Sequence, residues 1–297
     1  MTTLTRATDL LRIADLTPEE VTGLLDLAAA FKRDPHRRAA TLAGESVACY
    51  FSKPSTRTRV SFEAAAYRLG ALPIMLRPDE LQLGRGEPIA DTARVLGSYC
   101  AAIVIRTFAH SDVEEVARHA GVPVINALTD DHHPCQALAD VLTLRERFGA
   151  LAGLRVAYVG DGNNVARSLI EAAALTGIDL RLACPPGYEP DLAERVDDDP
   201  RVAVAGARAV YTDVWVSMGD EAGDRVRDLS AYRVTPDLMA LAAPDAIFLH
   251  CLPAHRGQEV DAAVIDGGQT AVWQQAANRL PTEQAALYAL VTGDWEV

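Results

Sequence analysis

Short apolar runs alternate with segments of helical periodicity along almost the whole chain of 297 residues. The apolar runs predict strands near 46–51, 72–76, 101–106 and 123–127, and again near 155–160, 179–183, 208–213 and 246–250. Strands that alternate with helices are typical of βαβ units, whose strands are parallel. The pattern therefore predicts an α/β protein with two doubly wound parallel-sheet domains and a cleft between them.

The boundary between the two predicted domains falls near residue 150. A helix over 135–148, ended by Gly149, separates the two sets of strands. The domains are therefore expected at residues 1–150 and 151–297. A last helical pattern, over 273–290, is too long for a tail, and we expect it to pack back on the first domain.

Composition and charge exclude several classes of protein. With 49% apolar and 23% charged residues, the chain is able to bury cores and is not disordered. The formal net charge is −13, of which about −2 lies in the first 150 residues and about −11 in the rest. An acidic chain without a long basic run is a poor general binder of nucleic acid. The more neutral half is better suited to a small anion, and the acidic half to a cation.

Cysteine usage and hydropathy predict a location in the cytoplasm. The cysteines are odd in number, widely spaced and without a CxxC pair: Cys49, Cys100, Cys135, Cys184 and Cys251. This pattern favours reduced thiols. The sequence has no HExxH motif and no Cys/His spacing typical of metal ligands, so it does not indicate a metal site. The longest aliphatic stretches, such as Ala101–Ile105, are far shorter than a membrane span. We expect no membrane association, no metal and no cofactor.

Residues with unusual chemistry gather where predicted strands end. These clusters are Ser52–Arg59, Arg106, His132–Gln136, Gly160–Asn164, Asp213–Met218 and His250–Arg256. In open parallel sheets, ligands bind outside the carboxyl ends of the strands. The clusters therefore indicate a ligand site.

The segment SKPSTRTR indicates a phosphate site. Ser55 or Thr56 is suited to cap the following helix, and Arg57 and Arg59 then fall in its first turn, where cations oppose the helix dipole. A bound phosphate would explain them, because the free amide groups of a helix start and arginine forks both bind anions. A plain cap with solvated arginines is the alternative.

Three further side chains suit the same ligand. Arg106 ends the apolar run AAIVIR, where a charge is costly unless it faces a ligand, although a surface arginine fits as well. His133 and Gln136 open the next helix and are able to donate hydrogen bonds to a carbonyl oxygen. A loop histidine without a role remains an equal alternative.

The second half offers polar groups of a different kind. The loop YVGDGNNVARS is similar to a dinucleotide loop, but Val165 stands at the third glycine position, so Asn163 and Asn164 are better suited to a polar substrate. Asp213 is a candidate partner for a cation, or an ordinary turn cap. Cys251 is a nucleophile, a proton acceptor or a small buried hydrophobe.

Taken in order, SKPSTRTR, HPCQ, DGNN, DVWVSMG and HCLPAHRG resemble the aspartate/ornithine carbamoyltransferase family. STRTR with HPxQ marks the wider family, and DVWVSMG with HCLP marks its ornithine branch. The resemblance runs from DLLRIADLTPEE to ANRL near residue 280. Ala277 departs from it, since ANRL is usually ENRL in the family.

The resemblance implies that the carbamoyl group of carbamoyl phosphate passes to the δ-amine of L-ornithine, giving L-citrulline and phosphate. It implies direct attack by the amine through a tetrahedral intermediate. It assigns catalytic roles to Arg106, His133, Asp213 and Cys251. It assigns carbamoyl phosphate binding to Ser55, Thr56, Arg57, Thr58, Gln82, Arg106, His133, Gln136, Cys251, Leu252 and Arg279. It assigns ornithine binding to Asn164, Asp213, Ser217 and Met218.

The family further implies a homotrimer, or a multiple of trimers, with Gln82 contributed by a neighbouring subunit. Within the same chemistry, the alternative acceptors are putrescine and an N-acylated ornithine. From a different class, the alternative is a nucleotide-binding regulatory protein that uses the DGNN loop.

Overall fold

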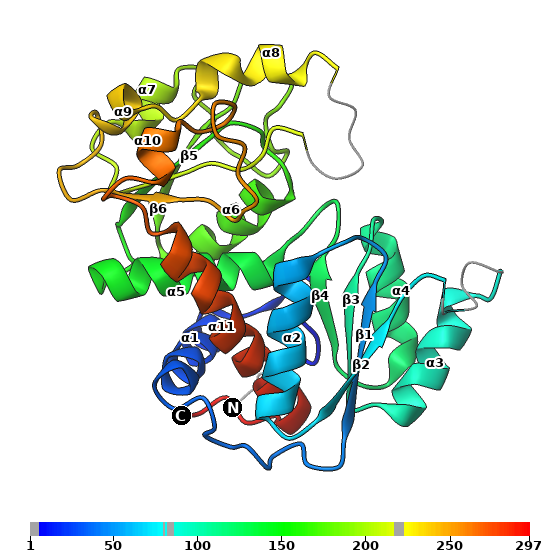
Figure 1. The fold of residues 1–297 in the computed structure, drawn as a ribbon. Coiled ribbons are helices and arrows are strands. Elements are labelled where there is room, and N and C mark those ends of the chain that lie inside the picture. The colour runs from blue at the N-terminus through cyan, green and yellow to red at the C-terminus, as the bar shows by residue number, and fades with distance from the viewer. Residues whose placement is uncertain (1–5, 80, 82–85, 217–222) are drawn as a thin grey trace. The chain divides into compact units, whose positions relative to one another are not determined.

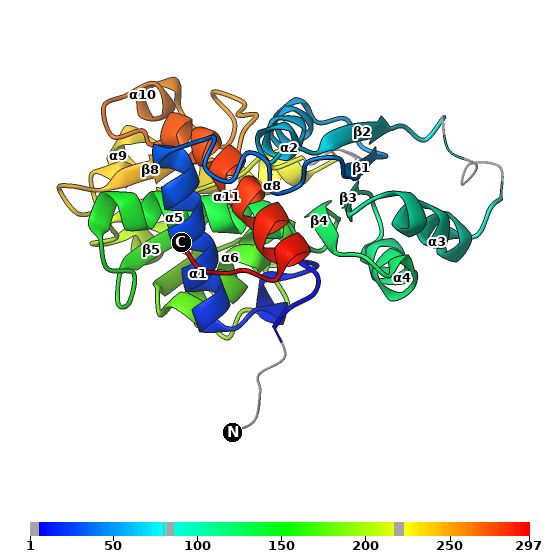
Figure 2. The same ribbon diagram turned by 90° about the horizontal axis from the view of Figure 1, so that it is seen from below.

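The structure is a computed structural model that describes residues 6–79, 81, 86–216 and 223–297. The chain divides into two compact units (Figures 1 and 2). Unit 1 comprises Met1–Leu138 together with Asn278–Val297, and unit 2 comprises Ala139–Ala277. No helix in the described ranges has the length and apolar character needed to cross a membrane.

Unit 1 contains a four-stranded parallel sheet in the order β2-β1-β3-β4. Its strands are β1 (Ser46–Phe51), β2 (Leu72–Leu76), β3 (Ala102–Arg106) and β4 (Val124–Leu128). From β1 the chain first adds β2 on one side and then β3 and β4 on the other. The order therefore reverses between β1 and β3, which is where doubly wound sheets bind ligands.

Helices cover both faces of this sheet. They are α1 (Pro18–Arg33), α2 (Thr56–Arg68), α3 (Ile89–Tyr99), α4 (His110–Ala120) and the part of α11 (Val272–Thr292) that begins at Asn278. The short helix η1 (Ile13–Asp15) precedes α1. Figure 1 shows α1, α2 and α11 on one face and α3 with α4 on the other. The helices α3 and α4 pack so closely at Gly97 that a Cβ at this position would lie 1.8 Å from the carbonyl oxygen of Ala120. Glycine at this position allows the close approach.

Unit 2 repeats the same plan with a sheet in the order β6-β5-β7-β8. Its strands are β5 (Arg155–Val159), β6 (Asp179–Ala183), β7 (Ala209–Tyr211) and β8 (Ile247–Leu249). Its helices are α6 (Asn164–Thr176), α7 (Pro200–Val204), α8 (Arg225–Leu229), η3 (Ser230–Tyr232), α9 (Pro236–Met239) and α10 (Ala262–Ile265). Val159, Val210 and Phe248 from three neighbouring strands are fully buried in its core. The predicted α/β class, with two parallel sheets, is confirmed.

Two helices contribute to both units. The helix α5 (Pro134–Phe148) divides after Leu138, and α11 divides after Ala277. The boundary near residue 150 that the sequence predicts lies just after the end of α5, where the helical periodicity stops. The two units divide within α5, and a continuous helix gives no break in periodicity at the point where its contacts change. Pro281 inside α11 lacks the N–H that would bond to the carbonyl of Ala277, so the helix is weakened next to its own dividing point.

Candidate functional site

The first turn of α2 combines a polar cap with basic side chains. Ser55 is the N-cap and accepts a hydrogen bond from the backbone N–H of Thr58 at 3.3 Å. No acidic residue occupies the first turn, although the helix dipole favours one there. Arg59 is paired with Glu63 one turn later (Nε to Oε1, 3.1 Å), whereas Arg57 is exposed beside the helix start. Arg57 is therefore the better placed of the two arginines to meet an anion at the helix N-terminus.

Arg106 lies beside this helix start because β1 and β3 are neighbours. It is the last residue of β3, is paired in register with Phe51, and is only 5% exposed. Its carbonyl oxygen accepts hydrogen bonds from both the backbone N–H (2.9 Å) and the hydroxyl (3.1 Å) of Ser52. The end of β3 is thus tied to the segment that leads into α2.

Arg279 on α11 joins two of the predicted residues. Its Nη1 donates to Oε1 of Gln136 at 2.9 Å, and its Nη2 donates to the hydroxyl of Thr58 at 3.1 Å. Arg279, Gln136 and Thr58 are all buried. One guanidinium therefore connects the start of α2, the start of α5 and the middle of α11. We call the set Ser55–Thr58, Arg106, His133, Gln136 and Arg279 the unit 1 cluster.

His133 contributes a neutral imidazole to the unit 1 cluster. Its carbonyl oxygen accepts from the backbone N–H groups of Gln136 and Ala137, which places the residue at the start of α5. Burial of the ring lowers its pKa well below the ordinary value, and the positive charges of Arg279, Arg106 and Arg57 lower it further. At neutral pH the ring is uncharged, so it is able to donate a hydrogen bond without adding another positive charge.

Two charged residues of unit 1 escaped the sequence prediction. Glu283 is the buried partner of Arg279. The two residues are four positions apart in a helical pattern, and this spacing could have indicated an ion pair between them. Lys53 lies within SKPSTRTR, whose phosphate site is assigned from the sequence to the two arginines. It is 4% exposed, pairs with the carboxylate of Asp130, and its Nζ lies 4.2 Å from the centroid of the Phe108 ring.

In unit 2, Asn163 connects the loop after β5 to the end of β7. Its side-chain oxygen caps α6 by accepting from the N–H groups of Val165 (2.9 Å) and Ala166 (3.3 Å). Its amide nitrogen donates to Oδ2 of Asp213 at 2.7 Å. Asn164, named by the family resemblance, is the first residue of α6 and is partly exposed.

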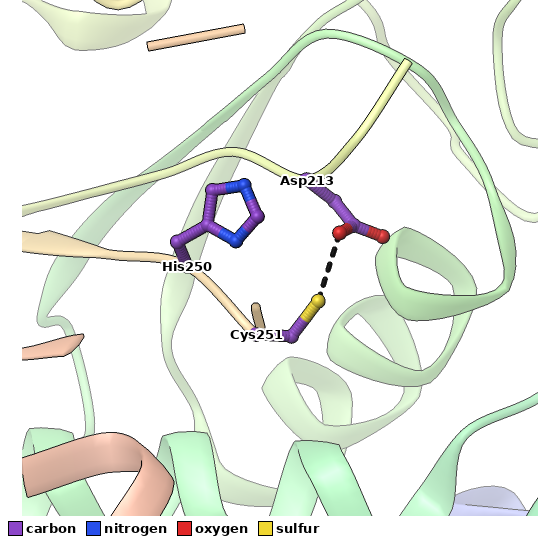
Figure 3. Close-up of side chains that lie close together, drawn as sticks. All are labelled: Asp213, His250 and Cys251. Atoms are coloured by element: carbon purple, nitrogen blue, oxygen red, sulfur yellow. Dashed lines mark hydrogen bonds between the residues drawn. The ribbon is translucent and has the colours of Figure 1, made fainter. Parts of the chain in front are cut away.

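Asp213 and Cys251 are in direct contact (Figure 3). They follow β7 and β8, which are neighbours in the sheet, and the Cys251 thiol donates to Oδ1 of Asp213 at 2.8 Å. Asp213 is 4% exposed, whereas Cys251 is more accessible. The order of the sheet therefore places the two residues at neighbouring strand ends. We call Asn163, Asp213 and Cys251 the unit 2 cluster.

His250 lies close to this pair but points its ring nitrogens elsewhere. The potential ligand atoms of Asp213, His250 and Cys251 lie within 4.8 Å of one another. However, Nδ1 of His250 accepts from the backbone N–H of Leu252 at 2.8 Å, which leaves the ring proton on Nε2, 3.3 Å from Oε1 of Glu259. A metal needs a nitrogen lone pair, and the one on His250 is already occupied. The donor set therefore fits a hydrogen-bonded group better than a metal site.

A partly buried ion pair holds the loop after β5 against the segment after β7. Arg225 at the start of α8 donates to Oδ2 of Asp161 at 2.5 Å and to the carbonyl oxygen of Trp215 at 2.9 Å. Gly162 of this loop has no room for a side chain, because a Cβ would lie 2.5 Å from the carbonyl oxygen of Tyr188. The loop that carries Asn163 is thus fixed from both sides.

The remaining predicted residues divide into two groups. Thr56 is the first residue of α2, and Leu252 directly follows Cys251 with a left-handed φ of 62°. Gln82, Ser217 and Met218 lie outside the described residues.

Comparison with known protein families gives a consistent result over both units. Residues 8–146 match the carbamoyl-P binding domain of aspartate/ornithine carbamoyltransferase, and residues 152–290 match the Asp/Orn binding domain of the same family.

Individual proteins agree with the family models. The chain is 52% identical over 294 residues to the ornithine carbamoyltransferase of Acidothermus cellulolyticus, covering 93% of this chain and 94% of that protein. It is also 52% identical to that of Methanothermobacter thermautotrophicus over 299 residues, with 95% and 98% covered. The crystal structure of ornithine carbamoyltransferase from Thermus thermophilus matches with a TM-score of 0.91 at 44% identity, covering 97% of this chain and 100% of that one. The chain therefore belongs to the aspartate/ornithine carbamoyltransferase family.

Proposed function

We propose that the protein transfers the carbamoyl group of carbamoyl phosphate to the δ-amine of L-ornithine, giving L-citrulline and phosphate. The observation that carries this proposal is the unit 1 cluster, in which Arg279 joins Thr58 and Gln136 beside the neutral His133. The relatives at 52% identity are named ornithine carbamoyltransferase, which supports ornithine as the acceptor.

The unit 1 cluster suits each part of carbamoyl phosphate. The first-turn N–H groups of α2, with Arg57 and Ser55, bind the phosphate, because a helix start and a guanidinium both stabilise an anion. Arg106 and the neutral imidazole of His133 donate to the carbonyl oxygen, where negative charge develops as the carbon is attacked. Arg279 holds Thr58 and Gln136 in place and adds its own positive charge beside the phosphate.

The unit 2 cluster suits a cationic amine. Asp213 is buried, and its carboxylate is paired with two neutral donors, the amide of Asn163 and the thiol of Cys251. A buried carboxylate is stabilised far more by an opposite charge, which the ammonium group of ornithine supplies. With a lysine-like pKa near 10.4, only about 0.04% of the amine is neutral at pH 7, so the site has to favour its deprotonation.

The reaction then proceeds by addition and elimination. The neutral amine attacks the carbamoyl carbon, forming the new C–N bond and a tetrahedral intermediate whose oxygen is negatively charged. The C–O bond to phosphate breaks as the carbonyl reforms, and the surplus proton on nitrogen leaves with phosphate or to solvent. Cys251 contacts and orients the amine in this scheme. No thiocarbamate forms on it, since direct attack needs no covalent relay.

We also propose a trimeric assembly through unit 1, as the family resemblance implies. Large apolar side chains are exposed on this unit: Val60 and Tyr67 on α2, Leu72 and Ile74 on β2, and Val95 and Tyr99 on α3. In addition, β2 is an edge strand of its sheet. Edge strands and exposed apolar patches are both suited to contact another subunit. We also propose a location in the cytoplasm, which the cysteine pattern of the sequence favours; none of its five cysteines, all of which are described, forms a disulfide.

The first prediction concerns the reaction itself. Purified protein with carbamoyl phosphate and ornithine is expected to form citrulline and phosphate, measured by colorimetric and phosphate-release assays. Putrescine and N-acetylornithine serve as competing acceptors in the same assay. Carbamoyl phosphate should raise the melting temperature, whereas NAD and ATP should not. Citrulline formation slower than transfer to putrescine would reassign the acceptor, and stabilisation by a nucleotide alone would favour the regulatory alternative.

The second prediction separates two neighbouring arginines. Arg57→Ala is expected to fold but to lose carbamoyl phosphate binding, since removing one partner of a desolvated ion contact costs about 2–5 kcal/mol. This corresponds to a loss of roughly 30-fold to several thousand-fold. Arg59→Ala is the matched control and should bind nearly normally, because Arg59 pairs with Glu63. Equal affinities of the two variants in calorimetry would show that Arg57 is a surface residue.

The third prediction tests the roles of Asp213 and Cys251. Asp213→Asn should lose most ornithine recognition, because it removes the counter-charge and keeps the shape. Cys251→Ala should keep measurable turnover with a raised KM for ornithine, and Cys184→Ala, a buried thiol of the same unit, should keep the KM unchanged. Mass spectrometry of enzyme quenched with carbamoyl phosphate alone should show no adduct, and a carbamoylated Cys251 would overturn direct attack.

The fourth prediction concerns assembly. Sedimentation of the wild-type protein is expected to give a trimer or a multiple of three. Tyr67→Arg with Leu72→Arg should shift the protein toward smaller species, because two charges then oppose burial of the patch. Val202→Arg, which replaces an exposed apolar side chain of unit 2, is the control and should leave the mass unchanged. A fully active wild-type monomer would contradict the proposal.

A further inference from the structure

Arg279 is held by a buried acid that the proposed reaction does not use. Glu283 lies one turn further along α11, and its Oε1 accepts from Nε (3.0 Å) and Nη2 (2.6 Å) of Arg279. The Arg279 side chain is 4% exposed and the Glu283 side chain is fully buried. The same guanidinium donates to Thr58 and Gln136, so the acid fixes the orientation of a group at the centre of the unit 1 cluster.

The surroundings of Glu283 contain one cation and several weakly polar groups. Burial raises the pKa of Glu283 to about 7, while Arg279 and the Ser61 hydroxyl on α2 act in the opposite direction. The Ser61 hydroxyl itself donates to the backbone oxygens of Arg57 and Thr58. Burial raises the pKa of the thiols of Cys49 on β1 and Cys135 on α5, and the negative charge of Glu283 contributes to raising both further. Glu283 therefore depends on Arg279 alone for its counter-charge among these groups.

An anion bound next to Arg279 changes this balance. The phosphate group and the Glu283 carboxylate would then share one guanidinium, and two negative charges close to one cation repel each other. In this buried setting the acid is able to relieve the repulsion by taking up a proton. A protonated carboxyl still offers an oxygen to Nε and Nη2 of Arg279, so the guanidinium keeps its orientation.

We propose that Glu283 is a positioning residue that couples phosphate binding at Arg279 to the uptake of a proton. This inference rests on the proposed function, because it takes the unit 1 cluster as the phosphate site. Before the anion arrives, the carboxylate holds Arg279 in place and balances its charge. When the anion binds, one O–H bond forms on Glu283, the proton comes from the solvent, and the full charge of Arg279 becomes available to the phosphate.

The coupling predicts the sign of the pH dependence. A bound anion raises the pKa of Glu283 above its value of about 7 in the unliganded protein. Affinity for phosphate is therefore greatest at low pH and falls as the pH rises above 7, by up to about ten-fold per pH unit, until the pKa of the complex is reached. At pH 7.5 about three quarters of Glu283 is unprotonated in the unliganded protein, so the wild-type protein should take up a fraction of a proton there for each anion bound, up to about 0.75.

Glu283→Gln separates this role from simple support. Glutamine keeps an oxygen for Arg279 and removes the titration, so this variant should bind phosphate about as tightly as wild type at pH 6 and up to about ten-fold more tightly at pH 8. Glu283→Ala loses the orienting oxygen and should bind more weakly at every pH. Glu63→Gln, which alters the i,i+4 pair with Arg59 on α2, is the matched control and should behave as wild type.

The test is isothermal titration of the full-length protein with inorganic phosphate, in buffers that share a pH but differ in ionisation enthalpy. The protonation of phosphate itself is common to all variants and cancels in the difference between them. Proton uptake that is clearly larger for wild type than for Glu283→Gln, by up to about 0.75 proton for each anion at pH 7.5, supports the coupling. Equal uptake with intact phosphate binding overturns the coupling and leaves the proposed function standing. A wild-type protein that binds neither phosphate nor carbamoyl phosphate overturns both.

A second measurement does not depend on the folding of any variant. The phosphate affinity of the wild-type protein, measured from pH 6 to pH 9 and corrected for the ionisation of phosphate, should fall above pH 7. A corrected affinity that stays constant over this range would overturn the coupling.

Discussion

The burial of one guanidinium is the constraint on which the organisation of unit 1 depends. A buried charge is costly unless its hydrogen bonds are satisfied, and Arg279 makes them with the start of α2, the start of α5 and a residue of its own helix. These contacts draw together residues more than 200 positions apart in the chain. The same positive charge helps to keep the His133 ring neutral. One side chain thus fixes both the geometry and the electrostatics of the unit 1 cluster.

Parallel strand order explains why both clusters form where they do. Neighbouring parallel strands end at the same edge, so β1 and β3 bring Ser52 to Arg106, and β7 and β8 bring Asp213 to Cys251. Helices that begin at this edge add free N–H groups, and their caps add side-chain contacts, as Asn163 does at α6. The sheet supplies the proximity, and individual hydrogen bonds then set the orientation.

The sequence predicts most of this framework because its signals are local. Apolar runs bounded by turns locate the eight strands of the described residues to within about two residues, and they place Asp213 and Cys251 after strands. The strand order that brings these two residues into contact comes from the structure. Contacts that depend on tertiary packing are not accessible in this way. The four-residue spacing of Arg279 and Glu283 is equally compatible with an exposed pair, and only the packing of α11 shows that it is buried. The continuous helices α5 and α11 likewise give no signal of where their contacts pass from one unit to the other.

Two buried acids show how the partner determines the chemistry available to a carboxylate. Glu283 faces a fixed cation of the protein, so its charge is balanced within the fold and a newly bound anion disturbs that balance. Asp213 contacts an amide and a thiol, which donate hydrogen bonds but carry no charge. Its negative charge is therefore available to a cationic ligand. An acid with a built-in counter-charge is suited to adjust the binding of an anion, and an acid with neutral partners is suited to select an amine. The two halves of the proposed reaction need these two properties.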